Sequence, residues 1–475
     1  MASPVEFYGF GARKMGRAGE GVALFDGTES ILSNPASLAG LPHAELSVGF
    51  LVADMRFADF PDVWWDTNRD GRIDDTDAPL EVDPTYDQVH GALIGATRPI
   101  GKRFAVGIGM FLPKDRLIRL ATFEPSLPTY FLYANRAQRY ELGVGAGWRP
   151  RWGLAVGGGI QMIPRARYSL AATLDVTVEP AADGDTGAGD VIGVVLDVHS
   201  MQLDLVPGFA PNLAFHWDVG EAVPALDGLQ LGASWRGEAG LPVDVEIDMQ
   251  INAGTAETAD VDAIVLPLVM AVQLGVFDHY VPSQWVVGAG YTIEDTLTLS
   301  ADLRRTAWDQ MQVSVAEVVS SEVEGAAVDL GDDPVVDGNP YTVTLRPTFA
   351  PRVGMDLRLP PLDGKRFGPV RGVVRGGVGF EPTPLVSQGE GSALLDADRF
   401  VFAVGGGVEH DDPFWRGGDA HRARWDLFFQ YHLLATGELA LAATDEPTAG
   451  YPVDGSAIPI GGHLLATGLQ LSFEY

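Results

Sequence analysis

Residues 66–77, DTNRDGRIDDTD, have the residue types and the spacing of a calcium-binding loop. In such loops, oxygen atoms at positions one, three, five, seven, nine and twelve surround the ion. These positions are held by Asp66, Asn68, Asp70, the backbone carbonyl of Arg72, Asp74 and Asp77. Gly71 stands at position six, where the loop must turn sharply. We therefore predict a structural Ca²⁺ ion here.

Two features distinguish this segment from a helix-loop-helix calcium site. Asp77 replaces the glutamate that usually closes the site with both carboxylate oxygens. Pro79 follows soon after, and proline disfavours the helix that would leave such a loop. A solvated acidic turn without metal is the alternative interpretation.

Several arginines lie opposite bulky residues in segments where apolar and small side chains alternate. They are Arg346, Arg352, Arg371 and Arg375. A guanidinium in an apolar passage can bind a carboxylate through two parallel hydrogen bonds, which predicts a ligand site. The alternative is that each arginine forms a salt bridge to Asp356, Asp302 or an acid of the N-terminal segment.

A second candidate ligand site lies in KDRLIRLATFEPSLPTYFLY, residues 114–133. Arg116, Arg119 and Phe123 stand there among leucine and aromatic residues, as in a groove where a hydrophobic ligand first binds. Packing of this segment over the molecule without a ligand is the alternative.

Composition and motifs exclude several classes of function. The net charge of −32 repels phosphate groups, so we expect no nucleic-acid partner. The chain has no cysteine, which excludes disulfides, thiolate metal sites and cysteine nucleophiles. It has no HExxH, GxSxG or P-loop motif, so we expect no enzymatic activity.

Period-two alternation recurs from about residue 44 to the end of the chain. In RYELGVGAGW, bulky residues from Tyr140 to Trp148 alternate with Glu141 and glycines. A soluble sandwich would turn its bulky side chains inward and its charges outward. Bulky residues on one face and small or polar residues on the other instead fit lipid outside and a filled lumen inside.

The connections support this interpretation. Tight turns at 98–103, 149–152 and 294–296 alternate with long polar segments such as 59–87 and 310–340. This alternation is typical of an outer-membrane barrel. The fold class is therefore all-β, a transmembrane antiparallel β-barrel. We expect no membrane helix at 263–277, because this apolar segment is short and contains Pro267.

The N-terminal stretch GRAGEGVALFDGTESILSNPASLAGL resembles the start of FadL-type transporters, which move long-chain fatty acids and other hydrophobic molecules across the Gram-negative outer membrane. The resemblance lies in the spaced glycines, the acidic turn at Asp26 and the element Asn34-Pro35-Ala36 just before the first strand. Later segments agree in order, including Asp302, Trp308 and the stretch 382–384.

The resemblance implies a barrel of about fourteen strands with an internal plug. Residues 1–43 would form this hatch, marked by Asn34, Pro35 and Ala36, and residues 44–475 the barrel with its extracellular loops. No secretory signal peptide is visible at the start of the chain, so we expect a processed form of an exported protein.

The function that follows is passive uptake of hydrophobic small molecules, such as fatty acids or hydrocarbons. Expected partners are outer-membrane lipid, the ligand, and the barrel-assembly machinery, which would bind the C-terminal strand ending in Phe473 and Tyr475. The alternative is a structural role, in which the same fold docks or carries a surface protein, as in secretion systems of the PorV type.

Overall fold

The computed structural model describes most of the chain. The described residues are 4–60, 63–65, 78–80, 86, 88–114, 128–133, 140–178, 191–239, 243–255, 264–274, 280–311, 317–323, 344–364, 368–386, 394–411, 421–439, 451–452 and 457–475.

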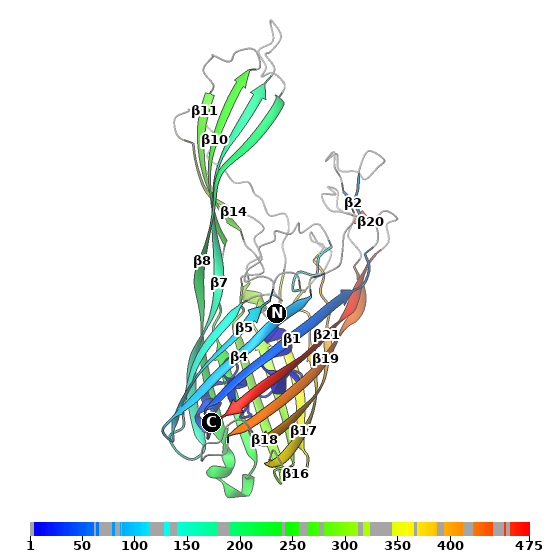
Figure 1. Cartoon of the computed structure of the whole chain (residues 1–475). Helices are drawn as coiled ribbons and strands as arrows, with labels where there is room; N and C mark the ends of the chain where they lie inside the picture. The colour runs from blue at the N-terminus through cyan, green and yellow to red at the C-terminus, as the bar shows by residue number, and fades with distance from the viewer. Residues whose placement is uncertain are drawn as a thin grey trace.

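Fourteen antiparallel strands of the described chain form a closed barrel (Figure 1). They are β1 (Glu45–Phe57), β4 (Val89–Ile100), β5 (Phe104–Pro113), β6 (Glu141–Trp148), β7 (Leu154–Val178), β8 (Val191–Asp218), β9 (Leu229–Arg236), β12 (Gln284–Ile293), β13 (Leu297–Thr306), β15 (Thr348–Arg358), β17 (Gly368–Glu381), β18 (Arg399–Asp411), β19 (Arg422–Leu439) and β21 (Ile458–Glu474). The ring closes where β1 pairs with β21, Glu45 opposite Glu474. The predicted barrel and its strand number are confirmed.

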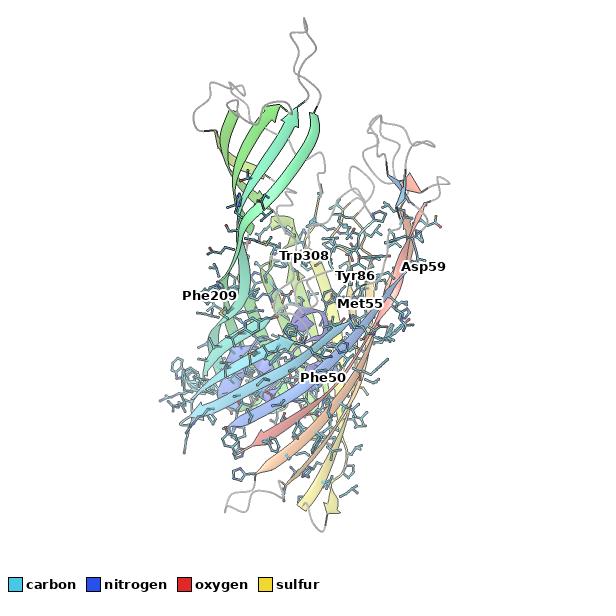
Figure 2. All side chains as sticks on the ribbon, turned by 45° about the horizontal axis from the view of Figure 1, so that its top comes forward. Phe50, Met55, Asp59, Tyr86, Phe209 and Trp308 are labelled. Carbon is cyan, nitrogen blue, oxygen red and sulfur yellow. The ribbon has the colours of Figure 1, made fainter. Side chains whose placement is uncertain are left out.

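Bulky side chains cover the outside of the barrel, and small or polar ones face the lumen. On β19, Trp425 and Leu427 are 45% and 57% exposed, whereas Asp426 between them is fully buried. Phe50 and Phe209 likewise point outward from β1 and β8 (Figure 2). An apolar exterior around a polar interior is the pattern of a barrel surrounded by lipid.

The two ends of the barrel differ. Turns at 101–103, 149–153 and 294–296 join neighbouring strands at one end, which is the periplasmic end in barrels of this type. At the other end, β1 stops at Phe57 and β4 starts only at Val89. Among the described helices, none is long and apolar enough to span a membrane.

A sheet that we call the fin rises from the extracellular end (Figure 1). It consists of the outer halves of β7 and β8 together with β10 (Val243–Thr255), β11 (Ile264–Leu274) and β14 (Glu317–Val323). β10 runs parallel to β7, with Val245 opposite Tyr168. The sequence analysis did not predict the fin. The segment 263–277, rejected as a membrane helix, contributes the fin strand β11.

Short elements complete the described fold. β2 (Val63–Trp65), β3 (Ala78–Leu80) and β20 (Tyr451–Pro452) form a small sheet at the extracellular end, and β16 (Leu362–Gly364) pairs with β17. Single turns of 3₁₀ helix are η4 (Val219–Glu221), η5 (Pro224–Leu226) and η7 (Trp308–Gln310).

The N-terminal segment, residues 4–44, lies inside the barrel and is called the hatch below. It contains α1 (Pro4–Tyr8), α2 (Ala12–Met15), η1 (Gly27–Ser30) and η2 (Pro35–Gly40). α2 packs against β18, β19 and β21, whereas η2 packs against β5 to β8. The hatch therefore contacts opposite sides of the wall and fills the space between them.

Glycines on the lumen faces of β4 to β7 let the hatch approach the wall. This glycine seat consists of Gly95, Gly107, Gly143, Gly145, Gly147 and Gly157. A Cβ atom at Gly147 would come within 3.0 Å of the Ala39 amide nitrogen, and one at Gly157 would overlap the Ala36 backbone. The alternating glycines of this region are thus contact sites for the hatch.

Gly157→Ala is expected to push the hatch off its seat, at a cost of about 1–3 kcal/mol from overpacking. Gly158→Ala is the matched control, because a Cβ on this neighbouring glycine meets no atom closer than 3.5 Å. Thermal unfolding and hydrogen exchange of hatch amides compare the two variants. Equal behaviour of both would show that the seat does not hold the hatch.

Candidate functional site

Arg17 is the centre of the contact between the hatch and the wall. Its guanidinium is almost fully buried and contacts three carboxylates: Glu20 at 2.8 Å, Asp26 at 2.6 Å and Asp356 of β15 at 2.8 Å. A buried cation of this kind is strongly unfavourable unless it is paired. Removing the arginine or its carboxylate partners would therefore leave a buried charge without compensation. The arrangement fixes the middle of the hatch to β15.

Wall residues extend this network around the barrel. Arg375 of β17 pairs with Asp426 of β19 at 2.7 Å and approaches Asp356 at 3.6 Å. Arg424 pairs with Asp426 at 3.0 Å and with Glu45 at 3.2 Å. The charges of β15, β17, β19 and β1 are therefore satisfied by one another and by the hatch.

Asp26 shows how strongly these charges act on each other. It lies in the hatch beside Arg17, and the ammonium of Lys14 is 3.5 Å away. Burial alone would raise the pKa of Asp26, yet Arg17, Lys14 and Arg13 outweigh it and hold that pKa well below its usual range. Asp26 is thus an anion at any physiological pH.

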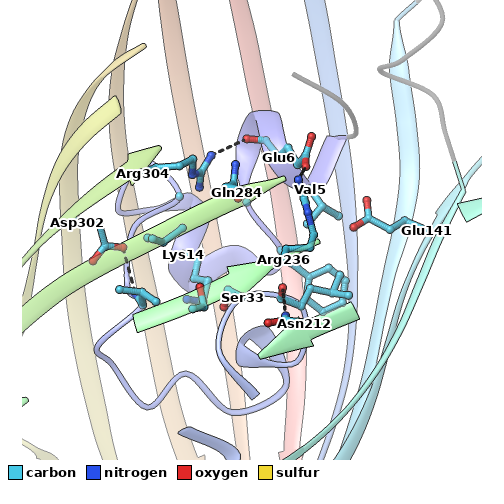
Figure 3. A pocket seen from close by; sticks show the side chains of 17 residues that line it. Val5, Glu6, Lys14, Ser33, Glu141, Asn212, Arg236, Gln284, Asp302 and Arg304 are labelled. Atoms are coloured by element: carbon cyan, nitrogen blue, oxygen red, sulfur yellow. Dashed lines mark hydrogen bonds and ion pairs between the residues drawn. The ribbon is translucent and has the colours of Figure 1, made fainter. Parts of the chain in front are cut away.

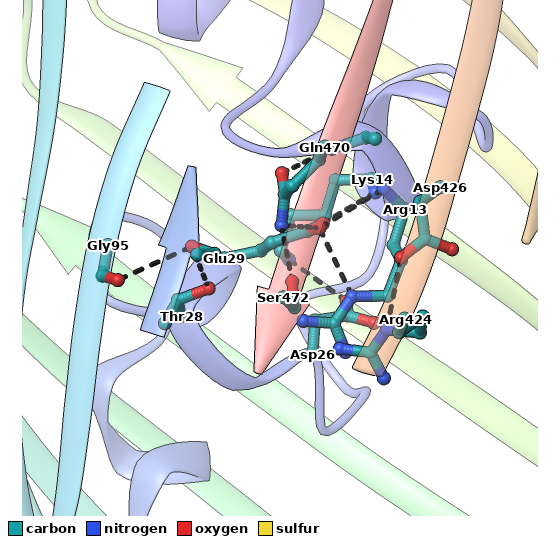
Figure 4. Close-up of polar contacts among 12 residues, drawn as sticks. Arg13, Lys14, Asp26, Thr28, Glu29, Gly95, Arg424, Asp426, Gln470 and Ser472 are labelled. Atoms are coloured by element: carbon teal, nitrogen blue, oxygen red, sulfur yellow. Dashed lines mark hydrogen bonds and ion pairs between the residues drawn. The ribbon is translucent and has the colours of Figure 1, made fainter. Parts of the chain in front are cut away.

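Glu29 and Gln470 position α2 (Figure 4). The Glu29 carboxylate accepts hydrogen bonds from the backbone amides of Arg13, at 3.2 Å, and Lys14, at 2.9 Å. Gln470 of β21 accepts from the amide of Ala12 at 2.9 Å. The first amides of a helix have no partner within the helix. Here the Glu29 carboxylate of the hatch and the side-chain oxygen of Gln470 in the wall supply these partners.

Asp302 and Asn34 fix the rest of the hatch. Asp302 of β13 accepts hydrogen bonds from the amides of Gly21, at 2.8 Å, and Val22, at 3.0 Å. Asn34 accepts from the amide of Ala36 at 3.1 Å and donates to the carbonyls of Val22 and Phe215. Asn34 thus satisfies irregular backbone of both hatch and wall, while Pro35 opens η2.

The predicted arginines separate into two groups. Arg352 is buried, donates to the Ala18 carbonyl of the hatch at 2.8 Å and pairs with Glu381. Arg352 therefore contacts the hatch, whereas Arg375 pairs with the wall acids Asp426 and Asp356, the second of which the salt-bridge interpretation named. Arg371 is half-exposed at the periplasmic end beside Glu409, and Arg346 is exposed near the loop carbonyl of Thr383.

The other predicted sites lie outside the described residues. They are Arg116, Arg119 and Phe123, and the calcium ligands Asp66, Asn68, Asp70, Arg72, Asp74 and Asp77. Among the residues that the structure does describe, no group of three or more histidine, aspartate or glutamate side chains could hold a metal ion.

Sequence reasoning missed the charged residues of the hatch itself. Arg13, Lys14, Arg17, Glu20 and Glu29 are all buried and paired. A signal was present, since a segment with this many charges can enter a narrow lumen only if acids and bases face each other. Asp302 was considered as a partner of an arginine, but it accepts hydrogen bonds from the backbone amides of Gly21 and Val22 instead.

A small polar cavity lies between the hatch and β6, β8, β9, β12 and β13 (Figure 3). Its volume is about 70 Å³. Lining side chains that carry charge are Glu6, Lys14, Glu141, Arg236, Asp302 and Arg304. A space of this size can hold a few water molecules but no acyl chain. This cavity is therefore too small for an acyl chain.

Aromatic side chains close the extracellular mouth above the hatch. Phe57 stacks on Tyr130 with ring centroids 4.1 Å apart, and Tyr133 packs against Phe57 at 5.1 Å and against Phe7 of the hatch at 5.4 Å. Met55, Tyr86 and Trp308 lie at the same end (Figure 2). We call this cluster the aromatic mouth. Its apolar surface is suited to hydrophobic molecules.

A lipid-facing barrel whose lumen is occupied by its own N-terminal segment defines a class, the plugged outer-membrane β-barrels. The chain is similar over its length to the crystal structure of a Pseudomonas aeruginosa FadL homologue, with 14% identity, a TM-score of 0.51 and 98% of each chain covered. For the P. putida toluene transporter TodX the values are 13%, 0.50 and 99% of each chain. Comparison with protein-family models and with curated proteins finds no match. The chain is therefore an outer-membrane barrel with the FadL fold.

Asp302→Asn is expected to loosen the turn at Gly21 and Val22, because the amide lacks the charge that strengthens both hydrogen bonds. Hydrogen bonds to charged groups contribute about 1.5–3 kcal/mol. Hydrogen exchange at these two amides should speed up. Asp295→Asn, in the exposed turn of the same hairpin, is the control. Unchanged protection in Asp302→Asn would contradict the assigned anchor.

Proposed function

We propose that this protein is a passive channel for the uptake of hydrophobic small molecules across the outer membrane. Long-chain fatty acids and hydrocarbons are the substrate classes. The FadL fold, shared with a protein described as a toluene transporter, supports the proposal. No step requires catalysis, since the ligand crosses unchanged down its gradient.

The observation that carries the proposal is the hatch beneath the aromatic mouth. A general porin needs a water-filled lumen, whereas this lumen holds residues 4–44 and a polar cavity of about 70 Å³. The way in begins at rings such as Tyr130 and Tyr133, which are fully buried. A ligand can replace ring contacts there without losing apolar burial, whereas a sugar would lose its hydration.

Passage beyond the mouth requires the hatch to shift or the wall to open. The hatch contacts β18 closely at Gly16 and Gly405, where an added Cβ would come within 3.0–3.2 Å of the facing Cα. Two cysteines at these positions require the facing backbones to separate by a few tenths of an ångström, after which their sulfur atoms are close enough for a disulfide. Because the chain has no other cysteine, this bond would be its only disulfide and would lock the hatch.

Cells that produce the barrel should take up radiolabelled oleate or toluene faster than cells without it, while a sugar of similar size should not enter faster. Oxidised Gly16→Cys/Gly405→Cys should lower the uptake at least tenfold, and reduction should restore it. The two single-cysteine variants are the controls.

Each outcome separates the alternatives. Uptake no faster than in cells without the barrel contradicts the transport function. Normal uptake by the oxidised double variant shows that the ligand leaves sideways through the wall without a shift of the hatch at α2. Entry of the sugar at the same rate would indicate a porin.

The fin favours a second candidate function. β7 and β8 have 25 and 28 residues, far more than the ~10 residues that cross a membrane, so they carry a sheet into the extracellular space. Transport alone does not require such a sheet. The fin would be used if the barrel docks or carries a surface protein. Purification of the barrel with a stoichiometric protein partner and no lipid in its lumen would support this role.

We also propose that residues 66–77 bind Ca²⁺ and order an extracellular loop. The described residues on either side of them, Trp65 and Ala78, are paired across β2 and β3. A closed loop of twelve residues is the form that surrounds Ca²⁺.

Calorimetry should detect one Ca²⁺ per chain with a dissociation constant of about 1 mM or tighter, as in extracellular calcium modules. The double variant Asp66→Asn/Asp70→Asn should abolish Ca²⁺ binding, because each of its two substitutions removes the charge of one ligand. Asp83→Asn/Asp87→Asn removes the same charge from the same acidic insert and should leave binding intact. Equal weakening by both pairs would mean diffuse attraction of cations.

A further inference from the structure

Four basic residues lie together at the periplasmic end of β4 to β7. The β4–β5 turn carries Lys102 and Arg103, and the β6–β7 turn carries Arg149 and Arg151. The two turns touch, since the Arg149 amide donates to the Arg103 carbonyl at 2.8 Å. A cavity of about 490 Å³ is lined by all four residues, called the basic cluster below. The chain as a whole has a net charge of −32, so this cluster stands out.

Most of the cluster is not neutralised by the protein. Arg149 pairs with Asp218 and Glu221 near the β8–β9 turn. The other three members are exposed, and no carboxylate of the described residues pairs with them. The β12–β13 turn differs, because it carries Glu294 and Asp295. The positive surface therefore attracts an anion from outside the chain.

Aromatic side chains place the cluster at the surface of the membrane. Phe104 and Trp148 are opposite each other in β5 and β6 and point outward, and Trp152 in the next turn is 67% exposed. Exposed tryptophans and other aromatics at strand ends mark the boundary between acyl chains and headgroups. The basic cluster is thus at the level of lipid phosphates.

An apolar groove runs along the outer wall above the cluster. Its volume is about 760 Å³. Ala146 and Gly158, directly opposite each other, form the floor, and Ile108, Val144 and Ile160 form a raised border. Arg98 lines this groove, while the next residue, Pro99, lines the cavity of the basic cluster. Groove and cluster therefore adjoin along β4.

We propose that the outer face of β4 to β7 holds one anionic phospholipid of the periplasmic leaflet. Its phosphate lies among Lys102, Arg103 and Arg151, and one acyl chain lies in the groove over Gly158. Neither feature alone specifies this ligand, since the groove fits any acyl chain and the cluster any anion. Their adjacency at the membrane boundary specifies a lipid with a charged headgroup.

The site sits behind the glycine seat. Strands β4 to β7 hold the hatch on their inner face, at Gly145 and Gly157 for example, and the lipid groove on their outer face. Glycines leave this part of the wall with few side chains to pack. A lipid in the groove would add packing contacts on its outer face. We therefore expect the lipid also to raise the thermal stability of the barrel.

Purified, delipidated barrel in detergent is mixed with equal amounts of phosphatidylglycerol and phosphatidylcholine, and retained lipid is counted by native mass spectrometry. Lys102→Gln/Arg103→Gln/Arg151→Gln tests the headgroup, and Gly158→Phe tests the groove. The control is Arg358→Gln/Arg371→Gln/Arg422→Gln, which removes three positive charges at the periplasmic end of β15, β17 and β19, two of them paired with Glu409.

Wild type should retain about one phosphatidylglycerol and at least tenfold less phosphatidylcholine. The headgroup triple variant and Gly158→Phe should each reduce retention at least tenfold, and the control triple variant by less than twofold. Equal retention of both lipids, or equal losses in both triple variants, would overturn the proposal. Displacement by equimolar oleate would assign the groove to a transported ligand instead.

Discussion

A buried guanidinium determines how this molecule is arranged. Arg17 cannot remain in the lumen without the carboxylates of Glu20, Asp26 and Asp356, which lie within 2.6–2.8 Å of it. Two of these acids belong to the hatch and one to the wall, so the same interaction folds the hatch and attaches it.

The hatch is held by polar contacts and by close packing. Towards β15 to β21 it is bound by ion pairs and hydrogen bonds, which must all be satisfied because the region is buried. Towards β8, Asn34 donates to the Phe215 carbonyl. Glycines allow close approach on both sides, at Gly157 for η2 and at Gly405 for Gly16. A shift of the hatch therefore has to break polar contacts as well as packing.

Alternation and short turns are local patterns, and they predicted the barrel and its inward and outward faces. The internal hatch was predicted only from the resemblance of the N-terminal stretch to FadL-type transporters. The sequence also placed Arg352 and Arg375 on a lumen face. Of their partners it named only Asp356, since the others depend on how the hatch folds in three dimensions. The fin was missed for a related reason, as β11 has the same apolar character as a membrane strand. Alternation with a period of two residues predicts a strand, but it does not tell whether lipid or water surrounds that strand.

The parallel pairing of β10 with β7 has a consequence for assembly. Strands β8 and β9 lie between them in the chain, so this contact has a larger separation in sequence than the neighbouring pairs of the wall, except for the seam between β1 and β21, where Glu45 is opposite Glu474. Long-range pairings form late, because the closure entropy of the intervening chain opposes them. The outer sheet should consequently become ordered after the short hairpins at its base, whereas the β1–β21 seam should close later still.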